Sequence, residues 1–228
     1  MAKKVLGALG IQIDAYVSAI GSILIDPKRF DLAEARQNPL NMPDAAAAQA
    51  AAQFLDECIA KGDSAGGVIE CVITGIKPGI GEPVFDKLDA RLSQAVMSIG
   101  AVKGIEFGAG FAVSGMTGAV NNDVFINKAG QIVTETNHAG GVLGGMANGA
   151  PIVFRCAVKP TPSISTAQQT VDKQGNPTNL SIHGRHDPLV ASRAVVVVEA
   201  MAAVTLADLI LTGLAARMDV VAEAYRLL

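Results

Sequence analysis

Three segments of the sequence combine residue types that could bind an anion or move a proton. Residues 136–149 carry repeated glycines, including Gly144, and glycine lets backbone N–H groups approach an anion or a ring face closely. Taken alone, the segment is more readily explained by tight turns and close packing of neighbouring elements. The segment also lacks a G-x-G-x-x-G pattern between a strand and a helix, so it does not indicate a dinucleotide site.

The second segment, residues 159–163, follows directly on an apolar run typical of a strand. Its prolines fix the backbone, while a lysine and two hydroxyl residues offer a cation and hydrogen-bond donors to an oxyanion. The alternative is a rigid strand exit with a solvated lysine. The residues of this segment are Lys159, Pro160, Thr161, Pro162 and Ser163.

The third segment places Arg185, His186 and Asp187 immediately before a long apolar run. A guanidinium can grip phosphate or carboxylate with two hydrogen bonds, and a neighbouring carboxylate can accept a proton. Asp187 followed by Pro188 is also typical of a helix N-terminus, where the carboxylate would simply cap the helix. The sequence leaves both interpretations open.

Metal and serine-nucleophile chemistry find little support. His183 and His186 lie three residues apart, but no cysteine or carboxylate neighbour completes a recognised zinc pattern. Ser163 and Ser165 have no local histidine, and no G-x-S-x-G elbow occurs. We expect no metal site.

The elements that must position these segments follow from periodicity. Alternating or β-branched runs predict strands, and apolar residues at helical spacing predict helices, one of them beginning at Val84. Glycines and turn signals fill residues 108–149. Because strands and helices do not alternate as regular βαβ units, we expect an α+β fold in a single domain over residues 1–228. The predicted strands are 11–18, 67–74, 102–107 and 151–158, and the predicted helices are 45–59, 84–96 and 193–214.

Composition limits the partners. Half of the residues are hydrophobic, the aromatic share is only 4%, and the formal net charge is −3, so the core is aliphatic and no nucleic-acid footprint is visible. Cys58, Cys71 and Cys156 show no pairing pattern, which predicts reduced thiols in a cytoplasmic protein. Glu199 and Asp208 interrupt the apolar run 191–216 on opposite sides of a helix, which favours a buried helix over a membrane span.

Seven segments, in this order along the chain, resemble the chorismate synthase family. The family's GDSxGGxxE pattern is matched by residues 62–70, and its PGLGEPVFDKLDA pattern by residues 78–90, with Ile80 in place of leucine. One such segment is a weak signal, but seven in the family's order are specific. The other five are residues 98–108, 121–123, 137–145, 159–164 and 184–188.

The resemblance implies a chorismate-synthase-like β-α-β sandwich, with helices between antiparallel sheets. It also implies a lyase that completes the shikimate pathway of aromatic amino acid biosynthesis. The family converts 5-enolpyruvylshikimate 3-phosphate to chorismate by 1,4-anti elimination of phosphate, using reduced FMN without net redox change. NADPH would be needed only if the enzyme reduces its own flavin. Members are typically homotetramers, and neither nucleic acid nor membrane is an expected partner.

The resemblance also implies the site. Gly100 and Ala101 match a pair that contacts FMN, although some members carry asparagine at the first position. The flavin-contacting glycine of the family's LGG segment matches Gly144. Asp187 matches an aspartate thought to help take the flavin N5 proton. The KPTxS flavin segment matches Lys159, Pro160, Thr161, Pro162 and Ser163, and the arginine placed near flavin and substrate matches Arg185.

The chain departs from the family in length. The family's N-terminal part, with two catalytic histidines, substrate-binding arginines and a further flavin segment, has no counterpart here, and residues 1–6 resemble a helix just after it. His138, His183 and His186 match neither catalytic histidine. We therefore expect an N-terminally truncated, C-terminal portion of the domain. The alternative to an active enzyme is an inactive remnant or split-enzyme subunit that only binds flavin or a partner fragment.

Overall fold

The computed structural model describes residues 1–184 and 186–227, and it confirms an α+β fold. Five strands form one sheet in the order β2-β1-β3-β9-β4, and every neighbouring pair is antiparallel. The strands come from distant parts of the sequence, so the sheet joins the two halves of the chain. Their bounds are β1 Gln12–Ile20, β2 Ile23–Leu24, β3 Gly67–Thr74, β4 Val102–Phe107 and β9 Ile152–Val158.

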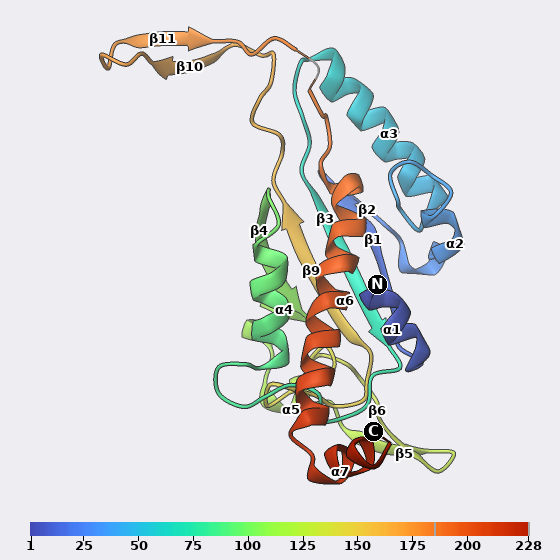
Figure 1. The fold of residues 1–228 in the computed structure, drawn as a ribbon. Helices are drawn as coiled ribbons and strands as arrows, with labels where there is room; N and C mark the ends of the chain where they lie inside the picture. The colour runs from blue at the N-terminus through green and yellow to red at the C-terminus, as the bar shows by residue number, and fades with distance from the viewer. Residues whose placement is uncertain (185, 228) are drawn as a thin grey trace.

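The helix α6, Ala191–Ala215, runs along one face of this sheet (Figure 1). It is flanked on one side by α1, Ala2–Ala8, and on the other by α4, Leu88–Met97. Glu199 bonds Lys3 of α1 at 2.6 Å, and Asp208 bonds Arg91 of α4 at 2.8 Å. The two acids in the apolar run thus lie on opposite sides of the helix, and each binds a cation from a flanking helix.

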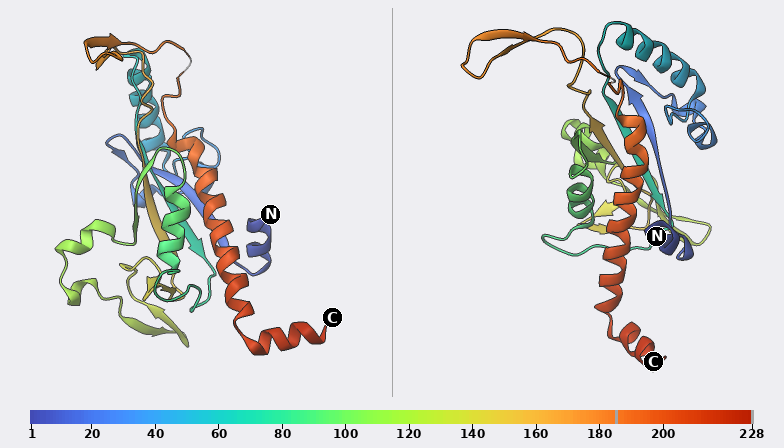
Figure 2. Two further views of the ribbon diagram at one scale, coloured as in Figure 1. Left: turned by 60° about the vertical axis from the view of Figure 1, so that its left-hand side comes forward. Right: turned by 45° about the horizontal axis from the view of Figure 1, so that its top comes forward.

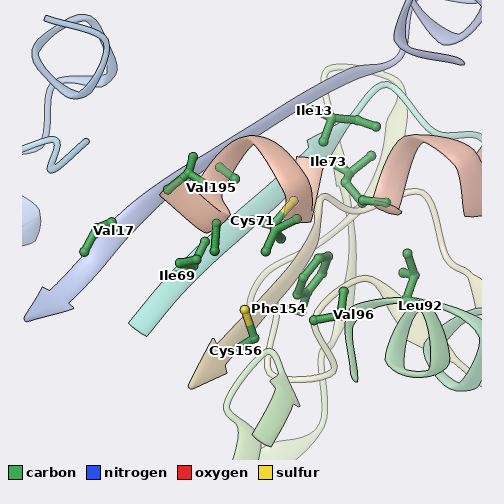
Figure 3. Close-up of a cluster of buried hydrophobic side chains, with 14 of the residues drawn as sticks. Ile13, Val17, Ile69, Cys71, Ile73, Leu92, Val96, Phe154, Cys156 and Val195 are labelled. Carbon is green, nitrogen blue, oxygen red and sulfur yellow. The ribbon is translucent and has the colours of Figure 1, made fainter. Parts of the chain in front are cut away.

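The core lies between α6, α4 and the inner face of the sheet (Figure 3). The pleat sends alternate residues inward, so β3 contributes Ile69, Cys71 and Ile73 while the residues between them face the other way. Phe154 and Cys156 of β9 lie against Val96 of α4 in the same layer. As expected, all three cysteines are free thiols, and all are buried.

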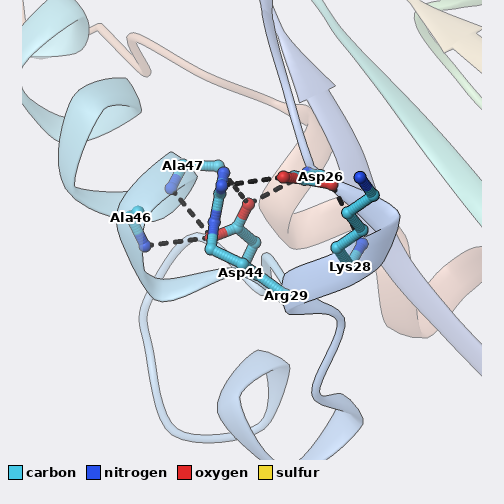
Figure 4. Close-up of polar contacts among 6 residues, drawn as sticks. All are labelled: Asp26, Lys28, Arg29, Asp44, Ala46 and Ala47. Atoms are coloured by element: carbon cyan, nitrogen blue, oxygen red, sulfur yellow. Dashed lines mark hydrogen bonds and ion pairs between the residues drawn. The ribbon is translucent and has the colours of Figure 1, made fainter.

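The helix α3, Ala45–Ala60, begins at a buried carboxylate (Figure 4). Asp44 accepts hydrogen bonds from the backbone N–H groups of Ala46 and Ala47, so it is the N-cap of the helix. Its other contacts are the Asp26 N–H and two nitrogens of Arg29, at 2.8 to 3.0 Å. The Arg29 hydrogen bonds hold the pKa of this carboxyl well below its ordinary value, despite burial.

Two predicted helix starts need correction. The helix α4 begins at Leu88, not at Val84, because Pro83 precedes a turn in which Val84 has a φ of +65° and the Glu82 N–H bonds Asp86. The helix α6 has Val190 at its N-cap with no side-chain cap, so the capping interpretation of Asp187 is wrong.

Burial of α6 is one-sided. Val195, Val198 and Leu206 are buried as expected. The expectation of a largely buried helix is wrong for the outer side, where Val196 is 65% exposed, Val204 58% and Leu211 61%. In the described residues α6 is the one helix long and apolar enough to cross a membrane, and half of its most apolar window is buried inside the protein. Its sheet-facing side is core, and its outer side carries an exposed apolar stripe.

The remaining elements lie around or project from this body. The hairpin of β10, Gln168–Val171, and β11, Pro177–Leu180, projects beyond the sheet in all views (Figures 1 and 2). In the turn of this hairpin, Asp172 accepts hydrogen bonds from the backbone N–H groups of Gln174 and Asn176. The others are η1 Pro27–Arg29, α2 Leu32–Ala35, η2 Gly110–Gly115, α5 Gly118–Asn121, β5 Phe125–Lys128, β6 Gln131–Thr134, β7 Val142–Leu143, β8 Met146–Ala147 and α7 Met218–Arg226.

Candidate functional site

The segment after β9 meets the segment before β4 at one end of the sheet. The Lys159 N–H donates to the Ala101 carbonyl at 2.9 Å, directly beyond the register pair Val102–Val158. Ala101 has a φ of +72°, and a Cβ added at Gly100 would meet no atom within 4 Å. The backbone of Gly100 and Ala101 therefore turns sharply beside open space, next to the exposed Lys159.

The same end of the sheet holds Asp187. The Thr161 hydroxyl donates to the Asp187 carbonyl at 2.8 Å, and the Ser64 hydroxyl donates to the Thr161 carbonyl at 2.7 Å. A further backbone bond joins Ala65 to Pro188 at 2.8 Å. Three segments far apart in the sequence are thus tied together around Thr161.

A cation not singled out in the sequence holds the Asp187 side chain. Arg193, in the first turn of α6, places Nη1 at 2.9 Å from Asp187 Oδ2. Sequence reasoning missed Arg193 and Ser64, although Ser64 lies in one of the family-like segments. The spacing between Asp187 and Arg193 crosses a helix start, so no fixed periodicity predicts that the two side chains meet.

Two further site residues are expected from the sequence. Arg185 lies outside the described residues. Gly144 lies in the turn between β7 and β8, where the neighbouring Gly145 carbonyl accepts from the Leu88 N–H at the start of α4. Gly100 instead follows the end of α4, ten residues or roughly 15 Å further along. Gly144 and Gly100 thus lie near opposite ends of α4.

The glycine-rich segment is explained in part by packing. A Cβ at Gly140 would lie 2.4 Å from the Gly108 nitrogen, and one at Gly141 would lie 2.5 Å from the Pro151 carbonyl oxygen. Only glycine fits at these two close approaches. Gly144 has open space at the same position, so packing does not account for it.

The fold and this cluster define a class of protein: an α+β chain that gathers an exposed lysine, hydroxyl groups and a carboxylate at one end of a sheet. Within the described residues, no group of three or more His, Cys, Asp or Glu side chains could hold a metal ion. The exposed Lys159 ammonium of this cluster can bind an anionic group.

Comparisons with known proteins give the family. Residues 1–211 match the family described as chorismate synthase. Proteins named chorismate synthase from Agathobacter rectalis and Lachnospira eligens are 53% and 56% identical over 226 residues, covering 99% of this chain. A crystal structure of chorismate synthase superposes with a TM-score of 0.77 at 31% identity, covering 93% of this chain and 61% of that one. The chain belongs to the chorismate synthase family.

The match is partial on the relatives' side. The chain spans 62% of the length of the Agathobacter and Lachnospira proteins. The match therefore shows the family of this chain, but not that the chain has the activity, substrate and partners of a whole chorismate synthase.

Proposed function

We propose that this chain supplies part of the flavin and substrate site of a chorismate synthase. The reaction is the 1,4-anti elimination of phosphate from 5-enolpyruvylshikimate 3-phosphate, with reduced FMN. Family membership supports the reaction, and one observation carries the site: Ala101, the Lys159 segment and Asp187 meet at one end of the sheet. These positions were assigned from three separate motifs, so their meeting is not a consequence of sequence proximity.

The residues present fit reduced FMN. The Lys159 ammonium is exposed and forms no ion pair with a described carboxylate, so it is available to a phosphate group. The half-buried Ser163 adds a hydroxyl, and the open space at Gly100 lets a flat ring approach the backbone. The cofactor, when bound, would supply an electron-rich ring close to the departing phosphate.

Asp187 and Arg193 form the proton-handling part of the proposal. The Arg193 guanidinium forms an ion pair with Asp187 Oδ2, and a carboxylate that faces a cation on one oxygen can take a proton on the other. Thr161 fixes the main chain at Asp187, so the carboxylate is oriented from both its backbone and its side chain. Asp187 would act as the base, Arg193 as its positioning residue, and Arg185 as a cation near flavin and substrate.

The relatives are longer than this chain, and the part that it does not match would lie around the same core. The rest of a full-length chain would complete the single domain and place a second antiparallel sheet over α6, as in the β-α-β sandwich. Gly144 would contribute to flavin binding from the other end of α4. The complete enzyme would be a homotetramer in the cytoplasm. It would use NADPH only if it reduces its own flavin.

A second candidate is a split-enzyme subunit or an inactive remnant. The exposed stripe on α6, with Val204 and Leu211 more than half exposed, favours it over a self-sufficient chain. A subunit of this kind would bind the missing N-terminal part through the stripe. A remnant would keep the fold and bind flavin weakly.

The deciding experiment is an anaerobic chorismate assay with reduced FMN. We expect no turnover by the chain alone, because each missing oxyanion donor costs roughly 10²–10³-fold in rate. Adding the N-terminal part of a relative in trans should restore activity if the chain is a competent subunit. Robust turnover by the chain alone would falsify the expectation that it is inactive. If both parts are folded and their mixture is still inactive, the chain is an inactive remnant.

A further inference from the structure

The outer face of the sheet, opposite α6, carries a row of polar side chains that the proposed reaction does not use. Tyr16 of β1 pairs in register with Glu70 of β3, Glu70 with Arg155 of β9, and Arg155 with Glu106 of β4. Four adjacent strands thus place one such residue each in a single line across the sheet.

The side chains in this row contact one another. The Tyr16 hydroxyl donates to Glu70 Oε1, and Arg155 Nη2 lies 2.8 Å from Glu106 Oε1. The nearest approach of Arg155 to Glu70 is longer, at 4.0 Å from Nε to Oε2. Glu106 is therefore well neutralised, whereas Glu70 Oε2 is only weakly compensated.

The row carries excess negative charge. Burial, together with the hydrogen bond to Glu70, raises the pKa of Tyr16 far above its ordinary value, so this side chain stays neutral. Glu70 and Glu106 contribute two negative charges and Arg155 one positive charge. The net charge at neutral pH is then −1.

A cavity of about 520 Å³ lies over this row. Its apolar wall comes from the segment after β1, including Leu24, Ile25, Pro27 and Phe30. The Phe30 ring packs edge-on against the Tyr16 ring, with 5.0 Å between the ring centroids. The volume suits a small molecule, and the combination of aromatic rings with a carboxylate attracts cations.

We propose that this cavity binds a small organic cation, an ammonium group on an apolar or aromatic body. The ammonium would hydrogen-bond Glu70 Oε2, and the apolar body would pack against Phe30 and the neighbouring aliphatic wall. An anionic ligand is disfavoured because the two carboxylates outnumber Arg155. The site is separate from the Lys159–Asp187 cluster, and it does not depend on the proposed reaction.

The test is a titration of the ¹⁵N-labelled chain with 2-phenylethylammonium, followed by NMR. We expect saturable shifts at amides lining the cavity, and much weaker shifts with the uncharged analogue 2-phenylethanol. Glu70→Gln should raise the Kd about tenfold, the usual effect of losing one charge-assisted hydrogen bond. The matched control is Glu57→Gln on the exposed side of α3, which should leave the Kd unchanged.

Arg155→Gln gives a prediction of opposite sign. Removing the cation makes the row more negative, so ammonium binding should tighten, whereas a site for anions would weaken. The dispersion of each spectrum reports whether the variant is folded, and Phe30→Leu provides a further variant at a partly exposed position, expected to weaken binding. Equal binding of the alcohol, an unchanged Kd in Glu70→Gln, weaker binding in Arg155→Gln, or no saturable shifts would each overturn the proposal.

Discussion

Asp187 is the residue on which the proposed chemistry most depends. In a full-length version of the protein, Asp187→Asn should lower chorismate formation by roughly 10²–10⁴-fold, the usual contribution of a group that transfers a proton. FMN affinity should change little, because the backbone bond from Thr161 does not involve the carboxylate. Turnover and FMN binding are measured on the same preparation, and near-normal turnover would remove Asp187 from the mechanism.

The buried thiols give a second prediction at this scale. Burial raises the pKa of Cys156 to about 11, and it raises the pKa of Cys71 well above its ordinary value. Thiolate is the reactive form, so both residues should resist a disulfide reagent at pH 8 until the protein unfolds. Labelling in a Cys58→Ala background, with and without denaturant, measures this, and rapid native labelling would contradict the inward positions of both side chains.

At the scale of elements, Asp44 joins α3 to the η1 segment. Asp44→Ala removes an N-cap, which costs about 1–2 kcal/mol, and it also leaves Arg29 without its main partner. Urea unfolding followed by circular dichroism should show a lower midpoint. The control is Asp172→Ala in the projecting β10–β11 hairpin, where the same change removes contacts outside the core and should matter far less.

The Asp44 carboxylate should also make the stability of the protein depend on pH. Its folded-state pKa is depressed, so its contribution is complete above the unfolded value of about 3.9 and is lost as the pH falls toward the folded value. The free energy of unfolding should therefore drop more steeply below pH ~5 for the native chain than for Asp44→Asn. Parallel slopes would show that this carboxylate has an ordinary pKa in the folded protein.

For the whole molecule, the question is what covers the outer stripe of α6. Val204→Glu should change the stability of this chain by no more than about 0.5 kcal/mol, because the side chain is already 58% exposed. The same change should abolish complementation by the N-terminal part, since it would place a charge in the expected interface. Thermal unfolding and the mixed assay measure the two effects, with Gln174→Glu in the projecting β10–β11 hairpin as the control. Full complementation by Val204→Glu would mean that the stripe is not the interface.

The sequence by itself determined the family, the four longest strands and, in outline, the three longest helices. Period-two and β-branched runs predicted β1, β3, β4 and β9 to within a few residues, because burial of one face of a strand imposes that pattern. The free cysteines and the α+β class were confirmed as well. The start of α4 was wrong because the four-residue spacing extends past Pro83 into a turn, where spacing alone cannot detect a positive φ at Val84.

Only the tertiary structure decided which distant groups meet. The pairing of β9 with β4 brings Lys159 to Ala101, and no local pattern encodes that pairing. The same holds for the Arg193 bond to Asp187 and for the row from Tyr16 to Glu106, since each depends on strand order and register. The structure also places Gly144 and Gly100 near opposite ends of α4, a separation that their motifs do not encode. Sequence periodicity reports which face of an element is buried, whereas long-range pairing is set by how all the buried faces pack together.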